Sequence, residues 1–221
     1  MTQSKRSFWE TRWPVMTSIH PQGPLPAPKT KRGERTRQKI LDAAEREIGA
    51  KGFAEASIAA ITAEADVAQG TFYLYFRTKE DVLRELVLRM GRRLRRHLTM
   101  AVTGATSRME AERHGLHAFL AFVRDNPNLY RVVAESQFVD ATVHKAYYDA
   151  FAANYREALE AAEAEGEITK GDAEVRAWAL MGVADMVGRR YALYDPKASL
   201  HDAAEAAYDF IANGLMERRH G

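Results

Sequence analysis

The sequence predicts an all-α protein, with an N-terminal three-helix domain of the helix-turn-helix type and a larger C-terminal helical domain. Apolar residues recur at helical spacing from about residue 33 to residue 218, and no segment shows the alternation of a strand. With 221 residues, of which 46% are hydrophobic, the chain can bury one small core and one larger core. We expect a disordered arm over residues 1–30, the small domain over 31–78 and the second domain over 79–221.

The predicted arm is rich in proline and has few periodic apolar positions. It is either an arm that touches DNA or an artefact of where the sequence starts. The chain has no cysteine, which excludes a disulfide framework and a thiolate metal site and fits a reducing compartment. Because no segment has the apolar core of a signal peptide or the length of a membrane span, we expect a cytoplasmic protein.

A first helix is predicted over about 33–51, with Ile40, Leu41 and Ile48 directed inward and Gly52 at its end. Basic residues crowd the start of this helix: Lys29, Lys31, Arg32, Arg35, Arg37 and Lys39. The net charge of the chain is only +2, and acidic residues gather instead over 157–174. The small domain is therefore the basic part of the chain.

Residues 57–82, SIAAITAEADVAQGTFYLYFRTKEDV, predict two short helices that meet at a tight turn. Ser57 can cap the first helix through its hydroxyl, and Asp66 ends that helix. The second helix, predicted from Val67 to Phe76, keeps Val67, Phe72 and Phe76 for the core and exposes Gln69, Thr71, Tyr73 and Tyr75. Exposed hydrogen-bonding groups on a short helix suit the major groove of DNA. Residues 78–81 resemble a capping box that opens the next helix.

This segment resembles the DNA-binding domain of the TetR family of bacterial regulators in the order and spacing of many positions. The matched positions are Ser57, Ile58-Ala59, Ala65-Asp66-Val67, Gly70-Thr71-Phe72-Tyr73, Tyr75, Phe76 and Lys79-Glu80-Asp81. Asp66 replaces the usual turn glycine, which is tolerable because aspartate enters the left-handed region more readily than most residues. Gln69 stands where the family often has lysine, so a phosphate contact is either weakened or replaced by a base contact.

The resemblance implies a set of DNA-contacting residues on the small domain. The set is Arg35, Ser57, Gln69, Gly70, Thr71, Tyr73, Tyr75 and Lys79. Thr71 would meet a base edge or methyl group, the tyrosine hydroxyls and the Lys79 ammonium would meet phosphates, and Gly70 would allow a close approach. The alternative is that these are solvated polar groups on an ordinary core helix.

A long helix from Lys79 to about residue 103 is predicted to link the two domains. The second domain then continues with helices over about 108–125 and 127–138, a helix ending near Gly166, and helices over about 172–194 and 200–218. Small residues including Ala203 and Ala207 form a stripe on the last of these. The resemblance implies that the last two helices of two chains pack as a four-helix bundle, giving a homodimer.

The resemblance also implies an effector pocket between the long helix and the helices that follow it. The candidate lining residues are Phe119, Phe122, Tyr130, Phe138, Tyr147, Phe151, Tyr155, Trp178 and Arg189. Helical aromatics can equally be plain core, and Asp185 offers Arg189 a simple ion-pair partner. Residues 126–194 are similar to regulators of fatty-acid or aromatic catabolism, which suggests a small hydrophobic effector such as an acyl-CoA thioester.

The sequence offers no candidate residues for catalysis. The chain lacks a cysteine nucleophile, a glycine-rich phosphate loop and a serine elbow, so we expect no enzyme and no cofactor. Glu110, His114 and His117 share one helical face, but two histidines without a third firm ligand favour a polar surface over a metal site. We therefore expect a ligand-responsive repressor that binds a palindromic operator in double-stranded DNA as a dimer. The alternative is a DNA-binding protein that acts through protein partners without a small effector.

Overall fold

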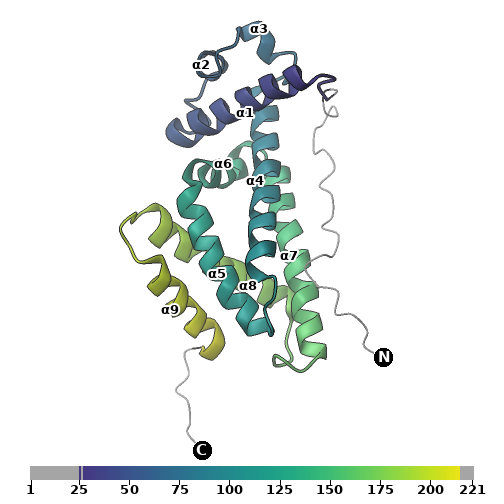
Figure 1. Ribbon diagram of the computed structural model, residues 1–221, viewed down its shortest axis with the longest axis vertical. Coiled ribbons are helices and arrows are strands. Elements are labelled where there is room, and N and C mark those ends of the chain that lie inside the picture. Colours follow the sequence, from purple (N-terminus) through teal and green to yellow (C-terminus); the bar gives the residue numbers. More distant parts are fainter. Residues whose placement is uncertain (1–24, 26, 215–221) are drawn as a thin grey trace, which may run out of the picture. The chain divides into compact units, whose positions relative to one another are not determined.

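The computed structural model describes residue 25 and residues 27–214, and within these residues it contains helices, turns and loops without a strand (Figure 1). The all-α prediction is confirmed. The described residues form two compact units, one of residues 25–93 and 126–149 and the other of 94–125 and 150–214. The predicted arm, residues 1–30, lies almost entirely outside the described residues. None of the described helices is long and apolar enough to cross a membrane.

The first unit begins with the three helices of the small domain, α1 (Lys31–Lys51), α2 (Ile58–Glu64) and α3 (Gln69–Phe72), seen in Figure 1. The Thr30 hydroxyl accepts the Gly33 N–H at 3.1 Å, and Gly52 ends α1 with a φ of 87°. The Ser57 hydroxyl accepts the Ala60 N–H at 3.1 Å, as the sequence predicted. Asp66 adopts a φ of 53° and so makes the turn between α2 and α3 in the left-handed region.

Helix α3 is shorter than the predicted span from Val67 to Phe76. Its regular part ends at Phe72, and the chain continues in turns in which the Leu74 N–H donates to Thr71 O at 3.3 Å and the Tyr75 N–H to Phe72 O at 2.9 Å. These bonds reach three residues back, as in a tightened last turn. The predicted boundaries were wrong because a helical apolar spacing does not distinguish such turns from α-helix.

The remaining elements of the first unit are the start of α4 (Lys79–Val102), α6 (Pro127–Val139) and the start of α7 (Ala141–Ala164). Thr78 caps α4 by accepting the Asp81 N–H at 3.2 Å, which confirms that part of the predicted capping box. Arg84 pairs with Asp81 at 2.8 Å and with Asp140 at 2.5 Å. Partial burial raises the pKa of Asp140, but the hydrogen bonds from Arg84 and Val143 outweigh this and hold the pKa below its usual value. This contribution to stability is therefore present at neutral pH and is lost as the pH falls through the lowered pKa.

Helix α6 packs closely against the C-terminal part of α1 within the first unit. A Cβ placed on Gly49 would lie 2.6 Å from the Cα of Asn128, so only glycine fits between the two helices. The Arg131 side chain donates to Gly49 O at 3.3 Å, and the Glu135 carboxylate accepts the Phe53 N–H at 2.5 Å. The Asn126 side chain does not cap α6, because its Oδ1 accepts from Arg93 instead.

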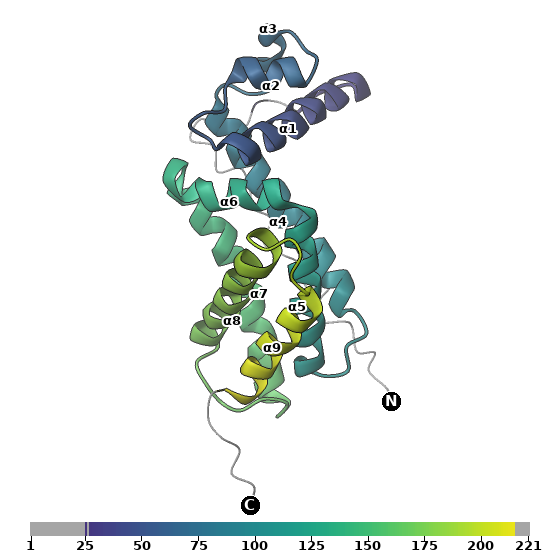
Figure 2. The ribbon, with the colours of Figure 1, turned by 90° about the vertical axis from the view of Figure 1, so that its left-hand side faces the viewer.

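The second unit contains the ends of α4 and α7 together with α5 (Arg108–Asp125), α8 (Ala173–Gly188), the π-helical segment η2 (Arg189–Leu193) and α9 (Leu200–Asn213). Helix α9 packs along α5, as Figure 2 shows. Their shared core consists of Leu116, Leu120, Ala203, Ala204 and Ala207. The predicted small-residue stripe of the last helix therefore faces α5 of the same chain.

A buried polar network lies inside the second unit. The Arg108 guanidinium donates twice to Glu112, and both side chains are almost fully buried. The Tyr155 hydroxyl donates to the other oxygen of Glu112 at 2.8 Å. Burial raises the pKa of Tyr155 well above its usual value, with the neighbouring Glu112 charge acting in the same direction. The network joins α5 to α7 through paired rather than isolated charges.

Replacing Gly49 with alanine is expected to destabilise the protein by about 1–3 kcal/mol, because the added methyl group meets the backbone of Asn128 and forces α6 away from α1. Chemical unfolding followed by circular dichroism measures this change. Gly115→Ala is the matched control, since its Cβ would make only one ordinary contact, 3.8 Å from Val102, in another helix. We expect the control to be neutral or stabilising by up to about 1 kcal/mol. Equal effects of the two changes would contradict a close α1–α6 contact.

Candidate nucleic-acid interface

The exposed surface of α3 and the turn after it carries the polar residues that the sequence singled out. Gln69 and Gly70 are exposed, Tyr73 is 50% exposed and Leu74 is 72% exposed. A Cβ on Gly70 would meet no atom within 4 Å, so the fold itself does not need a glycine there. The open space at Gly70 is suited to a close approach by another molecule.

Two aromatic rings anchor α3 from its inner side. Phe72 is fully buried and Phe76 is 3% exposed, and their ring centroids lie 5.7 Å apart. The Arg37 guanidinium of α1 lies 5.0 Å from the centroid of the Phe76 ring, which ties the segment to the first helix. Tyr73 packs edge-on against Phe72 at 5.5 Å, so its ring is fixed while half of its surface stays exposed. The exposed face is therefore held in a defined orientation.

The other predicted contact residues differ in the exposure of their side chains and in whether an internal hydrogen bond already uses them. Arg35 is exposed on α1, and Thr71 and Tyr75 are half-buried beside the turn. Ser57 is exposed, but its hydroxyl oxygen already accepts the hydrogen bond that caps α2. Together with α3, these positions lie in or directly beside the three helices of the small domain.

Lys79 has an internal role that the sequence did not reveal. Its ammonium donates to Phe53 O at 2.5 Å and to Ala56 O at 2.6 Å, with a longer contact of 3.4 Å to Ala54 O. It also lies 4.3 Å from the centroid of the Phe53 ring. An ammonium has three donors, so these carbonyls take up its hydrogen-bonding capacity. Lys79 therefore holds the loop between α1 and α2.

Glu135 binds the same loop from the other side. Its carboxylate accepts the Phe53 N–H, while Lys79 donates to the carbonyl of the same residue. Phe53 is thus fixed by α4 and α6 at once. Sequence reasoning missed Glu135 because it lies 82 residues from its partner, and no periodic pattern connects the two positions.

Most of the aromatic residues proposed as a ligand pocket are buried, but they divide between the two units. Tyr130 and Tyr147 are 6% exposed in the first unit, and Phe122 and Phe151 are 5% and 8% exposed in the second. Phe119 packs against the α5–α9 core. In the second unit the ring of Phe122 lies beside His97 and the ring of Phe151 beside Arg95.

Two members of that set lie on the surface instead. Phe138 is 85% exposed near the end of α6, and Trp178 is 41% exposed on α8, where its indole N–H donates to Glu174 at 2.8 Å. The helical spacing of apolar residues in the sequence does not show which face of a helix is buried and which is exposed. The two residues therefore do not belong to the buried aromatic group.

The polar members of the set have partners within the second unit. Arg189 donates to Asp185 at 3.0 Å, the simple pairing that the sequence offered. Tyr155 is engaged by Glu112. The buried Arg95 of α4, part of the basic run that begins at Arg92, lies 5.7 Å from the centroid of the Phe151 ring. A cation beside buried aromatics is suited to meet the anionic end of an apolar molecule.

Known proteins resemble this chain in two ways. The model of a family described as bacterial regulatory proteins, tetR family, matches residues 40–86. An uncharacterized HTH-type transcriptional regulator of Bacillus subtilis, YdgC, is 35% identical over 65 residues, which are 29% of this chain and 33% of the relative. The matched stretch thus spans about a third of that relative's length.

Solved structures share the fold. The FadR regulator of Bacillus subtilis, in complex with stearoyl-CoA, has a TM-score of 0.72 at 22% identity, covering 81% of this chain and 99% of its own. The fatty acid degradation regulator FadR of Bacillus halodurans has a TM-score of 0.75 at 22% identity. The match covers 87% of this chain and 100% of that regulator. A TetR-like transcriptional regulator of Rhodococcus sp. RHA1 has a TM-score of 0.68 at 27% identity, covering 81% and 95%. At 22% identity the two FadR structures bear on the fold alone.

Lys79→Ala is expected to lower the free energy of unfolding by about 1.5–3 kcal/mol, because it removes charged hydrogen bonds to the α1–α2 loop. Thermal and chemical unfolding measure this loss, with Lys39→Ala on the exposed face of α1 as control. The contrary result would be unchanged stability together with a weaker salt dependence of DNA binding, in which the slope of log K against log [salt] falls by about one unit. Lys79 would then be a phosphate contact only.

Proposed function

We propose that this chain is a bacterial regulator of the TetR family, and that it is a repressor released from a palindromic operator by a small hydrophobic effector. The observation that carries the proposal is the fixed, exposed face of α3 within the segment that matches the family. The family is one of transcriptional regulators rather than enzymes.

DNA recognition in this proposal uses α3 and its flanking turns. Gln69 and Thr71 reach base edges, where glutamine can pair with adenine and threonine can contact a thymine methyl group. The exposed Tyr73 and Arg35 meet phosphates, and Gly70 lets the backbone approach the duplex. Lys79 contributes by holding the loop that carries α2. Because phosphate contacts position the protein and base contacts specify the sequence, these two groups have separable effects.

The proposed operator is a palindrome because the protein is proposed to act as a dimer through α8 and α9. Large apolar side chains are exposed on these helices: Val175 is 63% exposed, Trp178 41%, Met186 63% and Phe210 44%. Exposed apolar groups of this kind are typical of a protein interface. A two-fold dimer would set two copies of α3 about 34–36 Å apart, one turn of DNA.

The proposed effector is a molecule with a long apolar part and an anionic end, of which an acyl-CoA thioester is one example. The buried rings of Phe122 and Phe151 would contact the apolar part, and Arg95 lies beside them. The FadR structure with stearoyl-CoA supports this choice by its fold, and the residues named here are this chain's own.

Coupling between effector and operator would pass through α4 and α6. Helix α4 supplies residues to both units and begins at Lys79, while α6 carries Glu135, and both side chains hold Phe53. An effector that moves α4 would displace the loop that leads to α2 and α3. Effector and operator would then compete through a coupling free energy, and each would weaken the binding of the other.

Met186→Arg is expected to yield monomers that no longer bind a two-half-site operator, because it places a charge in the proposed interface. Light scattering gives the assembly state, and a gel-shift assay gives the binding. Met100→Arg is the control, since Met100 is 71% exposed at the end of α4. An intact dimer of the Met186 variant would place the interface elsewhere.

The effector proposal is tested by operator release. A palindrome selected from random DNA by the wild-type protein is titrated with palmitoyl-CoA, palmitate, phenylacetyl-CoA and a cationic drug. We expect release by one of the anionic ligands, and a shifted release curve for Phe151→Trp, which puts a larger ring among the buried aromatic residues. Phe138→Trp, on the surface, should behave as wild type. Release by none of the four ligands would favour a regulator that acts through protein partners.

A further inference from the structure

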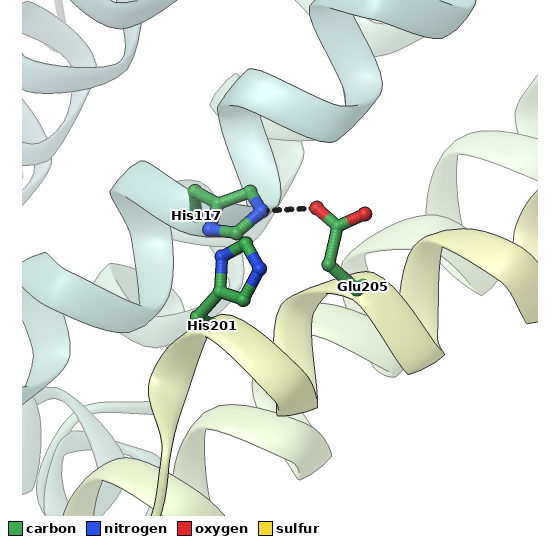
Figure 3. A group of neighbouring side chains, drawn as sticks. All are labelled: His117, His201 and Glu205. Carbon is green, nitrogen blue, oxygen red and sulfur yellow. Dashed lines mark hydrogen bonds and ion pairs between the residues drawn. The ribbon is translucent and has the colours of Figure 1, made fainter.

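Three side chains that can bind a metal ion meet where α9 packs along α5. His117 projects from α5, and His201 and Glu205 project from α9 one turn apart (Figure 3). Their ligand atoms all lie within 4.8 Å of one another. His117 and Glu205 are about one-third exposed and His201 is exposed, so an ion could reach the group from solvent.

The cluster differs from the histidine-containing face that the sequence displayed. Glu110 of that face is used to cap α5, accepting from the Thr106 N–H and hydroxyl at 2.6 Å each. His117 instead meets residues of α9 that lie more than eighty positions later in the chain. The third firm ligand that the sequence lacked is therefore supplied by the packing of α5 and α9.

The three groups already interact. The His117 Nε2–H donates to Glu205 Oε1 at 2.5 Å, and the His117 and His201 ring centroids lie 5.2 Å apart. Arg113 donates to both oxygens of Glu205, at 2.8 Å and 2.7 Å. Glu205 is thus a carboxylate held between Arg113 and His117, and a carboxylate is the form that binds a metal.

We propose that His117, His201 and Glu205 form a binding site for a divalent transition-metal ion of the Zn²⁺ class. Two imidazoles and one carboxylate are ligands that Zn²⁺ accepts, whereas Mg²⁺ and Ca²⁺ prefer oxygen throughout. Zinc lies about 2.0–2.2 Å from such ligands, so atoms up to roughly 4 Å apart can share one ion. The ligand atoms now lie within 4.8 Å of one another, so side-chain rotations that bring them within about 4 Å would complete this arrangement.

Arg113 is expected to set the affinity of this site. Metal binding would replace the direct His117–Glu205 hydrogen bond with two bonds to the ion, and His117 would exchange its Nε2 proton through solvent for one on Nδ1, so that neutral Nε2 meets the ion. Arg113 could keep its bond to Oε2 while Oε1 turns to the metal, but its positive charge opposes the ion. Removing Arg113 should therefore tighten metal binding, an effect that loss of a purely structural ion pair would not produce.

The test uses the untagged full-length protein in competition with a chromophoric chelator for Zn²⁺, and the absorption spectrum of bound Co²⁺. We expect one ion per wild-type chain, and loss of this site in His201→Ala and in Glu205→Gln. Arg113→Ala should bind several-fold more tightly. His114→Ala is the matched control, because His114 is exposed on the same helix outside the cluster, and it should bind as wild type.

Thermal unfolding gives an independent readout. An ion that bridges α5 and α9 binds only the folded chain, so Zn²⁺ should raise the Tm of wild type and of His114→Ala but not of His201→Ala. Circular dichroism checks that each variant is folded without metal. Equal Zn²⁺ affinity of wild type and His201→Ala, or weaker binding by Arg113→Ala, would overturn the proposal.

Discussion

The two backbone hydrogen-bonding groups of Phe53 are held by charged side chains from two different helices. The Glu135 carboxylate of α6 accepts the N–H, and the Lys79 ammonium of α4 donates to the carbonyl. A loop backbone has no ladder partner of its own, so such bonds decide where it lies. The position of α2, and with it the exposed face of α3, depends on these two contacts.

A close helix contact at Gly49 and an ion pair of Arg84 support this arrangement within the first unit. Gly49 lets α6 approach the end of α1 closely enough for Glu135 to reach the loop. Arg84 joins the start of α4 to Asp140, the residue between α6 and α7. The start of α4 and the C-terminal end of α6 are thus tied to the same loop and, through Arg84 and Asp140, to each other. A small displacement of either helix would be transmitted to the face of α3 rather than absorbed in a flexible connection.

The local features were predictable from the sequence, and the long-range ones were not. Ser57 as a cap, Asp66 as the turn residue and Phe72 as the anchor follow from spacing within a few residues. The pairing of Glu135 with Phe53, and of His117 with Glu205, joins residues 82 and 88 positions apart. Helical periodicity names an apolar or polar face but not the partner that it meets. For the same reason, Ala207 was assigned to a surface between chains although it packs against α5.

The central claim is that Glu135 and Lys79 act together through Phe53 to set the DNA-reading face. A double-mutant cycle on operator affinity tests it, comparing Glu135→Ala, Lys79→Ala and the double variant with wild type on one selected operator. Because both side chains hold the same loop residue, the account predicts non-additive effects, with a coupling energy of about 0.5–3 kcal/mol. Effects that add within about 0.3–0.5 kcal/mol would mean that the two contacts act independently, and would contradict the claim.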